Sequence, residues 1–164
     1  MKAIVSVDRN WGIGSGNDLL YHIPADMRFF KNTTINNVVI MGQATFFSLP
    51  NSQPLKDRIN IVLAADETWS HEGVITCHTM EEVLGVANRF DPDRVFVCGG
   101  ASIYAQMIDY CDEAYITKVD DAAENVEKFF PNLDEKPDWE LVDAQPAQEH
   151  NGISFSFTTY RRKK

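Results

Sequence analysis

Residues 22–31, HIPADMRFFK, contain an acid that could act as a reagent. Pro24 suits the first turn of a helix and Asp26 suits the positive end of the helix dipole, so a structural role explains both positions. However, Phe29 and Phe30 follow Asp26 by three and four residues, which places all three side chains on one helical face. A surface capping acid does not need apolar neighbours. Asp26 is therefore a candidate for acid–base chemistry, with a helix-end residue as the alternative.

Two strand-to-helix junctions contain glycine and could hold phosphate. CGGAS (98–102) and MGQAT (41–45) each join an apolar strand to a helix-like segment. The backbone can approach a ligand closely at glycine, and the free N–H groups of a helix start attract anions. In an α/β sheet both junctions would lie near one crevice, at the carboxyl ends of the strands. The pair favours a ligand with two or more phosphates, although each could be a simple tight turn.

A third glycine-rich stretch, GIGSG (12–16), follows the first strand but is not followed by a helical run, so it resembles a dinucleotide fingerprint only weakly. We interpret it as a flexible loop. The sequence has no GxxxxGK[ST] motif, which excludes P-loop hydrolysis.

Composition excludes several classes of function. The formal charge of −9 over 164 residues opposes binding to nucleic acid, and the terminal RRKK (161–164) is interpreted as a solvated tail. Cys77, Cys98 and Cys111 are odd in number and lack CxxC spacing, so we expect reduced thiols and no metal site. MKAIVSV is too short for a signal peptide, and no apolar run could span a membrane. The sequence predicts a cytoplasmic protein that does not bind membranes.

The pattern of apolar residues predicts a single α/β domain covering residues 1–164. Strands that are apolar at nearly every residue indicate a parallel sheet covered by helices on both faces. A polar connection between the last two strands predicts an antiparallel hairpin at one edge. The predicted strands are 3–7, 38–41, 59–64, 94–98, 114–119, 139–144 and 153–160. One predicted helix begins in the opening stretch, and two others cover 80–90 and 102–110.

Five motifs in order carry a resemblance to dihydrofolate reductases along nearly the whole chain: IPADM with FFK, VVIMG, DRINIVL, VCGGASIY and YITKVD. The resemblance implies that family's single-domain α/β fold, with an eight-stranded, mostly parallel sheet, an antiparallel C-terminal strand and helices on both faces. It also implies NADPH-dependent reduction of 7,8-dihydrofolate to tetrahydrofolate, which supports one-carbon metabolism and thymidylate synthesis. A monomer that binds antifolate inhibitors is expected.

The resemblance assigns Asp26 to the pterin, where it would orient the ring and assist protonation at N5. Burial should raise its pKa, because a low-dielectric site disfavours the charged carboxylate. Thr117 would orient the acid, and Tyr21 would replace a family tryptophan that holds a water. Arg58 would bind the α-carboxylate of the glutamate tail through its planar guanidinium. The implied substrate-binding residues are Val5, Ser6, Asp26, Met27, Phe30, Leu49, Arg58, Cys98, Tyr104 and Thr117.

For the cofactor, the resemblance implies a cis peptide between Gly99 and Gly100, ahead of a helix that faces the pyrophosphate. A mobile loop that contains Ile13, Gly14, Asn17 and Leu19 would close over the nicotinamide and exclude water. The remaining implied cofactor-binding residues are Ser6, Gly42, Gln43, Ala44, Thr45, Leu63, Ala64, Ala65, His78, Ala101, Ser102, Ile103 and Tyr104.

The chain departs from the family pattern where the 2′-phosphate of NADPH would bind. Gln43 and Ser102 stand at positions that are usually arginine, and Ala64 and Ala65 are followed by Asp66, whose charge would repel a phosphate. His78 is a partial substitute. We therefore expect weak NADPH preference, with NADH usable.

Two alternative functions remain open. One is the related reductase of riboflavin synthesis, which should lack the Pro-Ala-Asp helix and the Arg58 match. The other is a nucleotide-binding module without turnover, for which the altered phosphate site and Tyr21 argue.

Overall fold

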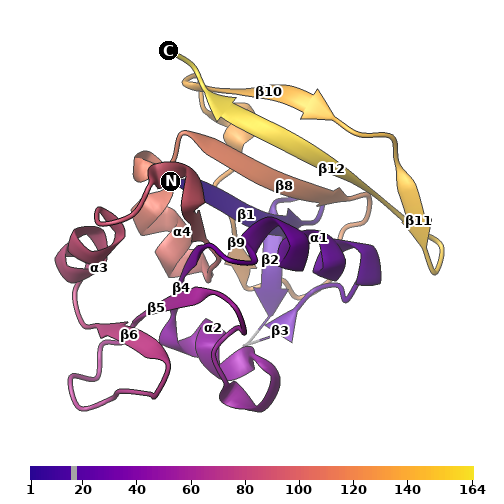
Figure 1. Cartoon of the computed structure of the whole chain (residues 1–164). Coiled ribbons are helices and arrows are strands. Elements are labelled where there is room, and N and C mark those ends of the chain that lie inside the picture. The colour runs from indigo at the N-terminus through magenta and orange to yellow at the C-terminus, as the bar shows by residue number, and fades with distance from the viewer. Residues whose placement is uncertain (16–17) are drawn as a thin grey trace.

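The computed structural model describes residues 1–15 and 18–164, and within them the main sheet has the strand order β10-β12-β8-β1-β7-β4-β5-β6 (Figure 1). Pairs between neighbours from β8 to β6 are parallel, whereas β12 runs antiparallel to both β8 and β10. The predicted α/β sheet and its antiparallel edge are confirmed. These strands are β1 (Lys2–Val7), β4 (Val38–Gly42), β5 (Ile59–Leu63), β6 (Val74–Cys77), β7 (Val95–Val97), β8 (Glu113–Val119), β10 (Trp139–Ala144) and β12 (Ile153–Arg162).

Helices cover both faces of the sheet, as predicted. In β4, Val38 and Ile40 pack in one core with α3 and α4, whereas Val39 and Met41 pack in a second core with Phe46 of α2. All four β4 residues are buried, which explains why this strand is apolar at every position. The helices are α1 (Pro24–Thr34), α2 (Gln43–Ser48), α3 (Met80–Ala87) and α4 (Ala101–Met107), with short 3-10 turns at η1 (Pro50–Ser52), η2 (Pro92–Arg94), η3 (Ile108–Tyr110) and η4 (Leu133–Glu135).

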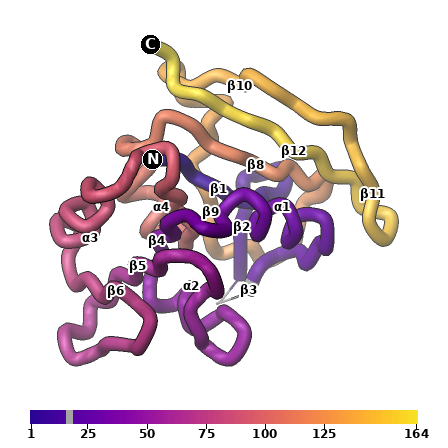
Figure 2. The backbone as a smooth tube through the Cα atoms, in the orientation of Figure 1, coloured from indigo at the N-terminus to yellow at the C-terminus, as the bar shows by residue number. Residues whose placement is uncertain are grey.

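A small second sheet was not predicted. It has the order β3-β2-β9, from β2 (Gly12–Ser15), β3 (Asp18–Leu19) and β9 (Lys128–Phe129), and so part of the GIGSG stretch is a strand rather than a flexible loop. Gly12 serves close packing there, because a Cβ would lie 2.7 Å from Val126 Cγ1. In Figure 2 the chain can be followed from β3 into the start of α1.

Several boundaries differ from those predicted from sequence. The expected helix 80–90 ends at Ala87, and the expected helix 102–110 divides into α4 and η3. The strand β6 and the short β11 (Gln148–His150), which pairs with β12, were missed because runs of four and three residues are too brief to show a periodic pattern.

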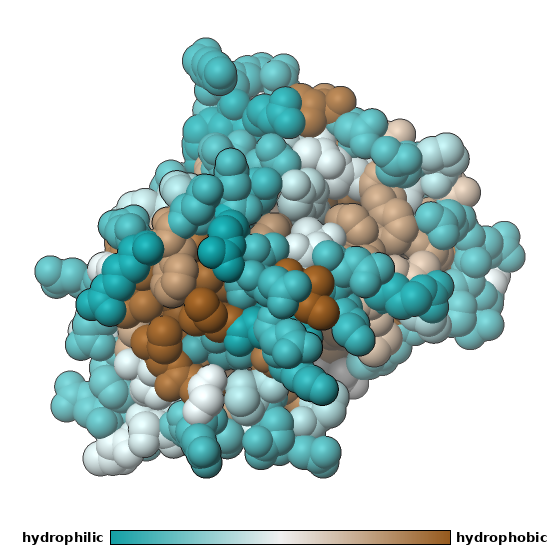
Figure 3. All heavy atoms as spheres, viewed as in Figure 1, coloured by the Kyte–Doolittle hydropathy of each residue, from teal (hydrophilic) through white to brown (hydrophobic). Residues whose placement is uncertain are grey.

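The face of the molecule in Figure 3 is mainly hydrophilic, with hydrophobic residues gathered toward its left side. In the described part of the chain, no helix has the length and apolar character that a membrane crossing requires.

Candidate active site

Asp26 and Thr117 meet where α1 lies against β8. The Thr117 hydroxyl donates a hydrogen bond of 2.6 Å to Asp26 Oδ1. Thr117 is buried, whereas Asp26 is half-buried. Burial raises the pKa of Asp26 above its ordinary 3.8, and the smaller effect of the Thr117 hydrogen bond lowers it. The carboxyl group therefore takes up a proton more readily than an exposed aspartate does.

Local sequence and aromatic packing place α1. Pro24 occupies the first turn, Asp26 is the acid of that turn, and Lys31 lies in the last turn. Phe29 stacks on Phe157 with ring centroids 4.7 Å apart, which holds the helix against the sheet. The sequence placed Phe29 with Asp26 on one apolar face, and the structure uses that residue to dock the helix.

Arg58 is held by residues that the sequence did not single out. Its Nη1 donates to Thr34 Oγ1 over 3.1 Å and its Nε donates to the Lys56 carbonyl over 3.0 Å. Thr34 is buried at the end of α1, and the buried Asn60 side chain donates to the Arg58 carbonyl over 3.1 Å. The remaining N–H groups of the guanidinium are left for an anion.

Two of the predicted substrate-binding residues, Leu49 and Cys98, pack beside α2. Leu49 and Cys98 are partly buried against the core that contains Phe46. Burial raises the pKa of the Cys98 thiol to about 12, so this cysteine stays protonated and serves as a small apolar residue. Met27 and Leu19 expose 56% and 59% of their surface, so much of each side chain is open to solvent.

The two glycine junctions lie side by side, as the sequence predicted. Gly42 N–H donates to the Gly99 carbonyl over 2.9 Å, and a Cβ on Gly100 would lie 3.3 Å from Thr45 Oγ1. The Gly99–Gly100 peptide is cis, and Gly99 has φ of 121°, a conformation that favours glycine. Gly42 and Gly100 cap α2 and α4 without a side-chain hydrogen bond, which leaves backbone N–H groups for an anion.

Tyr104 stands between the glycine junction and β1. It is buried, a Cβ on Gly99 would lie 3.4 Å from its ring, and its hydroxyl donates to the Ile4 carbonyl over 2.7 Å. Burial raises its pKa, so the phenol remains neutral. The predicted residues Val5 and Ser6 follow Ile4, and Ser6 is the β-sheet partner of Thr117. The acid and the glycine junction therefore both adjoin the end of β1.

His78, proposed as a substitute for the missing arginines, has a fixed ring. Its Nδ1 lies 2.9 Å from the Ala64 carbonyl, which can only accept, so Nδ1 donates this hydrogen bond. Asp66 Oδ1 accepts from the Thr68 N–H and hydroxyl, which lowers its pKa. Ser102 Oγ accepts from Gln106 over 3.0 Å. Asp66 is thus a fixed negative charge two residues beyond Ala64.

The Tyr21 hydroxyl has a partner that the sequence did not reveal. It donates to Asp121 Oδ2 over 2.6 Å. No signal in the sequence pointed to Asp121, because the pairing joins residues far apart in the chain. The same holds for Thr34 and Asn60, which position Arg58. Among the predicted cofactor residues, Asn17 lies outside the described residues.

The remaining predicted residues adjoin these features. Gln43, Ala44 and Thr45 form the first turn of α2, Leu63 ends β5, and Ala65 follows the buried Ala64. Ala101 and Ile103 belong to the first turn of α4, Phe30 is half-buried on α1, and Ile13 and Gly14 lie in β2.

One acid of raised pKa, held near two adjoining glycine junctions at the carboxyl edge of a mostly parallel sheet, defines a nucleotide-binding α/β enzyme. Comparison with known proteins agrees. The family model described as dihydrofolate reductase matches residues 1–162, and the chain belongs to the dihydrofolate reductase family. Its activity is the NADPH-dependent reduction of dihydrofolate.

Individual relatives support this assignment over the full length. The chain is 33% identical to the dihydrofolate reductase of Bacillus subtilis, with 98% of this chain and 93% of the relative covered. It is 31% identical to that of Staphylococcus aureus, with 100% and 99% covered. A structure of the enzyme from Enterococcus faecalis, complexed with NADP(H) and RAB-propyl, matches with a TM-score of 0.88 and 32% identity over 99% of this chain and 96% of that one.

Proposed function

We propose that Asp26 orients the pterin in this reaction and assists protonation at N5. The observation that carries the proposal is the Thr117–Asp26 hydrogen bond of 2.6 Å on a carboxyl group of raised pKa. Burial favours the protonated form, and Thr117 fixes the direction of one oxygen, which leaves the other for the heterocycle. Replacement of Asp26 is the direct test, and its expected result opens the Discussion.

The residues of the glycine junctions fit a dinucleotide. We propose that Gly42 to Thr45 and Gly99 to Ile103 hold the pyrophosphate through backbone N–H groups, with Tyr104 beneath the nicotinamide. The fit rests on the close approach of Gly100 to Thr45, where a Cβ would be in tight contact, and on helix starts that no side chain caps. When bound, the cofactor supplies the hydride.

We further propose that Arg58 binds the carboxylate of the glutamate tail, that Leu49, Phe30 and Cys98 line the pterin side, and that antifolate ligands occupy the same place. Arg58 supports this role because Thr34 and Lys56 hold its guanidinium and leave donors open. The folded domain of residues 1–164 is proposed to act as a cytoplasmic monomer, consistent with buried free thiols at Cys77 and Cys111.

Thr117→Val is expected to move the pH dependence of turnover toward higher pH. In the wild type, the hydrogen bond from Thr117 lowers the pKa of Asp26. Valine cannot make this bond, so the pKa of Asp26 should rise further. We also expect kcat at neutral pH to fall about three- to tenfold, since a typical intramolecular hydrogen bond contributes about 0.5–1.5 kcal/mol. A kcat–pH profile measures both effects. Thr117→Ser, which keeps the hydroxyl, serves as the control; a Thr117→Val profile that coincides with the wild type would contradict the assignment.

NADH use remains a prediction from the sequence, and the comparisons support NADPH alone. If Asp66 opposes the 2′-phosphate, Asp66→Asn is expected to strengthen NADPH binding and leave NADH binding unchanged, because only NADPH carries the extra anion. Titration of each variant with both nucleotides at low and high salt measures this. Glu67→Gln, at the neighbouring exposed acid, is the control.

A wild-type kcat/KM ratio of a thousand or more in favour of NADPH would reject NADH as a usable cofactor.

A further inference from the structure

A second cross-link joins the segment before α1, which carries Asp26, to the connection after β8, which carries Thr117. Tyr21 lies between β3 and α1, and its hydroxyl donates to Asp121 in the connection that follows β8. The distance is 2.6 Å, typical of a hydrogen bond to an ionised acceptor, which is among the stronger kinds. Burial and this bond raise the pKa of Tyr21, so the phenol keeps the proton that it donates. One hydrogen bond therefore joins α1 to β8 directly, and a second joins the segments that flank them.

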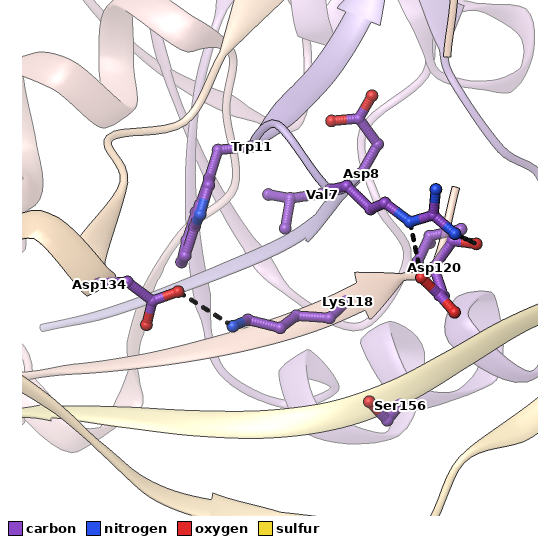
Figure 4. A pocket seen from close by; sticks show the side chains of 9 residues that line it. Val7, Asp8, Trp11, Lys118, Asp120, Asp134 and Ser156 are labelled. Carbon is purple, nitrogen blue, oxygen red and sulfur yellow. Dashed lines mark hydrogen bonds and ion pairs between the residues drawn. The ribbon is translucent and has the colours of Figure 1, made fainter. Parts of the chain in front are cut away.

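Asp121 belongs to a connection that is itself firmly held. Arg9 Nε pairs with Asp120 Oδ1 over 2.7 Å, and Arg9 N–H donates to the Asp121 carbonyl over 2.9 Å. The buried Asp8 carboxylate accepts from the backbone N–H of Ala123 over 3.1 Å and of Gly12 over 2.7 Å. Figure 4 shows Asp8 and Asp120 together, with the Asp120 interaction dashed. Asp121 is thus a fixed acceptor for the Tyr21 hydroxyl.

The cavity beside this connection, of about 270 Å³, lies on the opposite side of β8 from Asp26, because its lining residue Lys118 alternates with Thr117 along the strand. Its charged groups are already paired, Lys118 with Asp134 over 3.3 Å and Arg9 with Asp120 (Figure 4). We therefore assign no ligand to it. Both ion pairs lie beside the connection that carries Asp121.

We propose that Asp121 is a positioning residue for the reaction, acting through Tyr21 to fix the segment between β3 and α1. The proposal rests on the role of Asp26 proposed above. Tyr21 also packs against the buried cluster of Ile23, Val119 and Phe155, so its ring position is set by packing and its hydroxyl direction by Asp121. Loss of the bond should let the start of α1 shift relative to β8, which misplaces Asp26. Asp121→Ala would break the bond and keep every side chain assigned to the substrate.

Three variants test this. Tyr21→Phe removes the donor, Asp121→Ala removes the acceptor, and Asp121→Asn keeps a neutral acceptor. We expect the first two to lower kcat about fivefold to tenfold, with KM for dihydrofolate within about twofold, as for the loss of one charge-assisted hydrogen bond. Asp121→Asn should recover about half of the wild-type kcat. The double variant should be no slower than either single variant, because both remove the same bond. Glu124→Gln, which removes an exposed charge from the same connection, is the control.

Hydrogen exchange in the ligand-free protein gives a readout independent of turnover. Amides of residues 20–23 should exchange about tenfold faster in Tyr21→Phe and Asp121→Ala than in Glu124→Gln. Multiplicative losses of kcat in the double variant, or single variants that match Glu124→Gln in turnover and exchange, would overturn the proposal. If either of these results is found while Asp26→Asn has impaired turnover, only the positioning role of Asp121 fails. If Asp26→Asn keeps wild-type turnover, the role of Asp26 fails as well.

Discussion

Asp26→Asn is expected to lower kcat for dihydrofolate reduction at neutral pH by about 100-fold or more, the usual scale for losing acid–base assistance. Asparagine has nearly the same shape and its amide oxygen can still accept from Thr117, so the helix should keep its place. The amide cannot take up and release a proton. Steady-state kinetics measures the loss, and Glu140→Gln, an exposed acid on β10, is the matched control.

The loss should shrink as the pH falls, because protons from solution can then replace the one that Asp26 handles. Turnover of Asp26→Asn that remains within a few-fold of the wild type across the neutral range would remove Asp26 from the mechanism.

The same substitution should stabilise the protein at neutral pH. The pKa of Asp26 is raised in the folded state above its ordinary 3.8, so the folded state binds more protons than the unfolded state as the pH rises from that value. The stabilisation that the protonated Asp26 carboxyl group gives the fold is therefore complete at low pH. It is lost as the pH rises through the raised pKa. Asparagine carries no such cost. Thermal unfolding should therefore give a higher Tm for Asp26→Asn at pH 7 and a smaller difference at pH 4; a lower Tm at pH 7 would show that the carboxylate stabilises the fold.

Arg58→Lys is expected to raise KM for dihydrofolate about tenfold or more, with little change in kcat. The guanidinium presents a planar fork of donors to a carboxylate, whereas the lysine ammonium is a single charged point that cannot bind both oxygens in the same way. Lysine would also lose the bond from Nη1 to Thr34, which orients the side chain. A loss of about 1.4 kcal/mol corresponds to that factor of ten.

A truncated substrate makes the Arg58 test specific. A pteridine without the glutamate tail should be turned over equally well by wild type and Arg58→Lys, because the tail alone would reach the guanidinium. Arg89→Lys, at an exposed arginine just beyond α3, is the control for the exchange itself. If Arg58→Lys left KM for dihydrofolate unchanged, the assignment of the tail carboxylate to Arg58 would be wrong.

Residues whose neighbours are close in the chain were predictable. The apolar run of β4 predicted a strand buried on both faces, and the order of strands and helices predicted a parallel sheet. Pro24 and Asp26 predicted the start of α1 because helix-end preferences act within a few residues. The glycine junctions predicted a shared edge, since parallel strands end on the same side of a sheet.

The sequence did not predict where glycine was needed for space. In GIGSG it indicated flexibility, yet Gly12 lies in a strand whose neighbour Val126 comes from a distant part of the chain. Backbone freedom is a local property and can be inferred from residue type, but close packing depends on which segments meet. The two roles of glycine look the same in the sequence.

The sequence by itself determined the α/β class, the helix that carries Asp26 and the strand-to-helix junctions, because periodicity, capping and turn chemistry operate over a few residues. Only the tertiary structure decided that Thr34 steadies Arg58 and that Tyr21 bonds to Asp121, whereas the bond from Thr117 to Asp26 was expected from the family resemblance. Each of these hydrogen bonds joins side chains distant in sequence, and its direction depends on how α1 sits against the sheet. That placement is set by the summed packing of the core, which no short stretch of sequence contains.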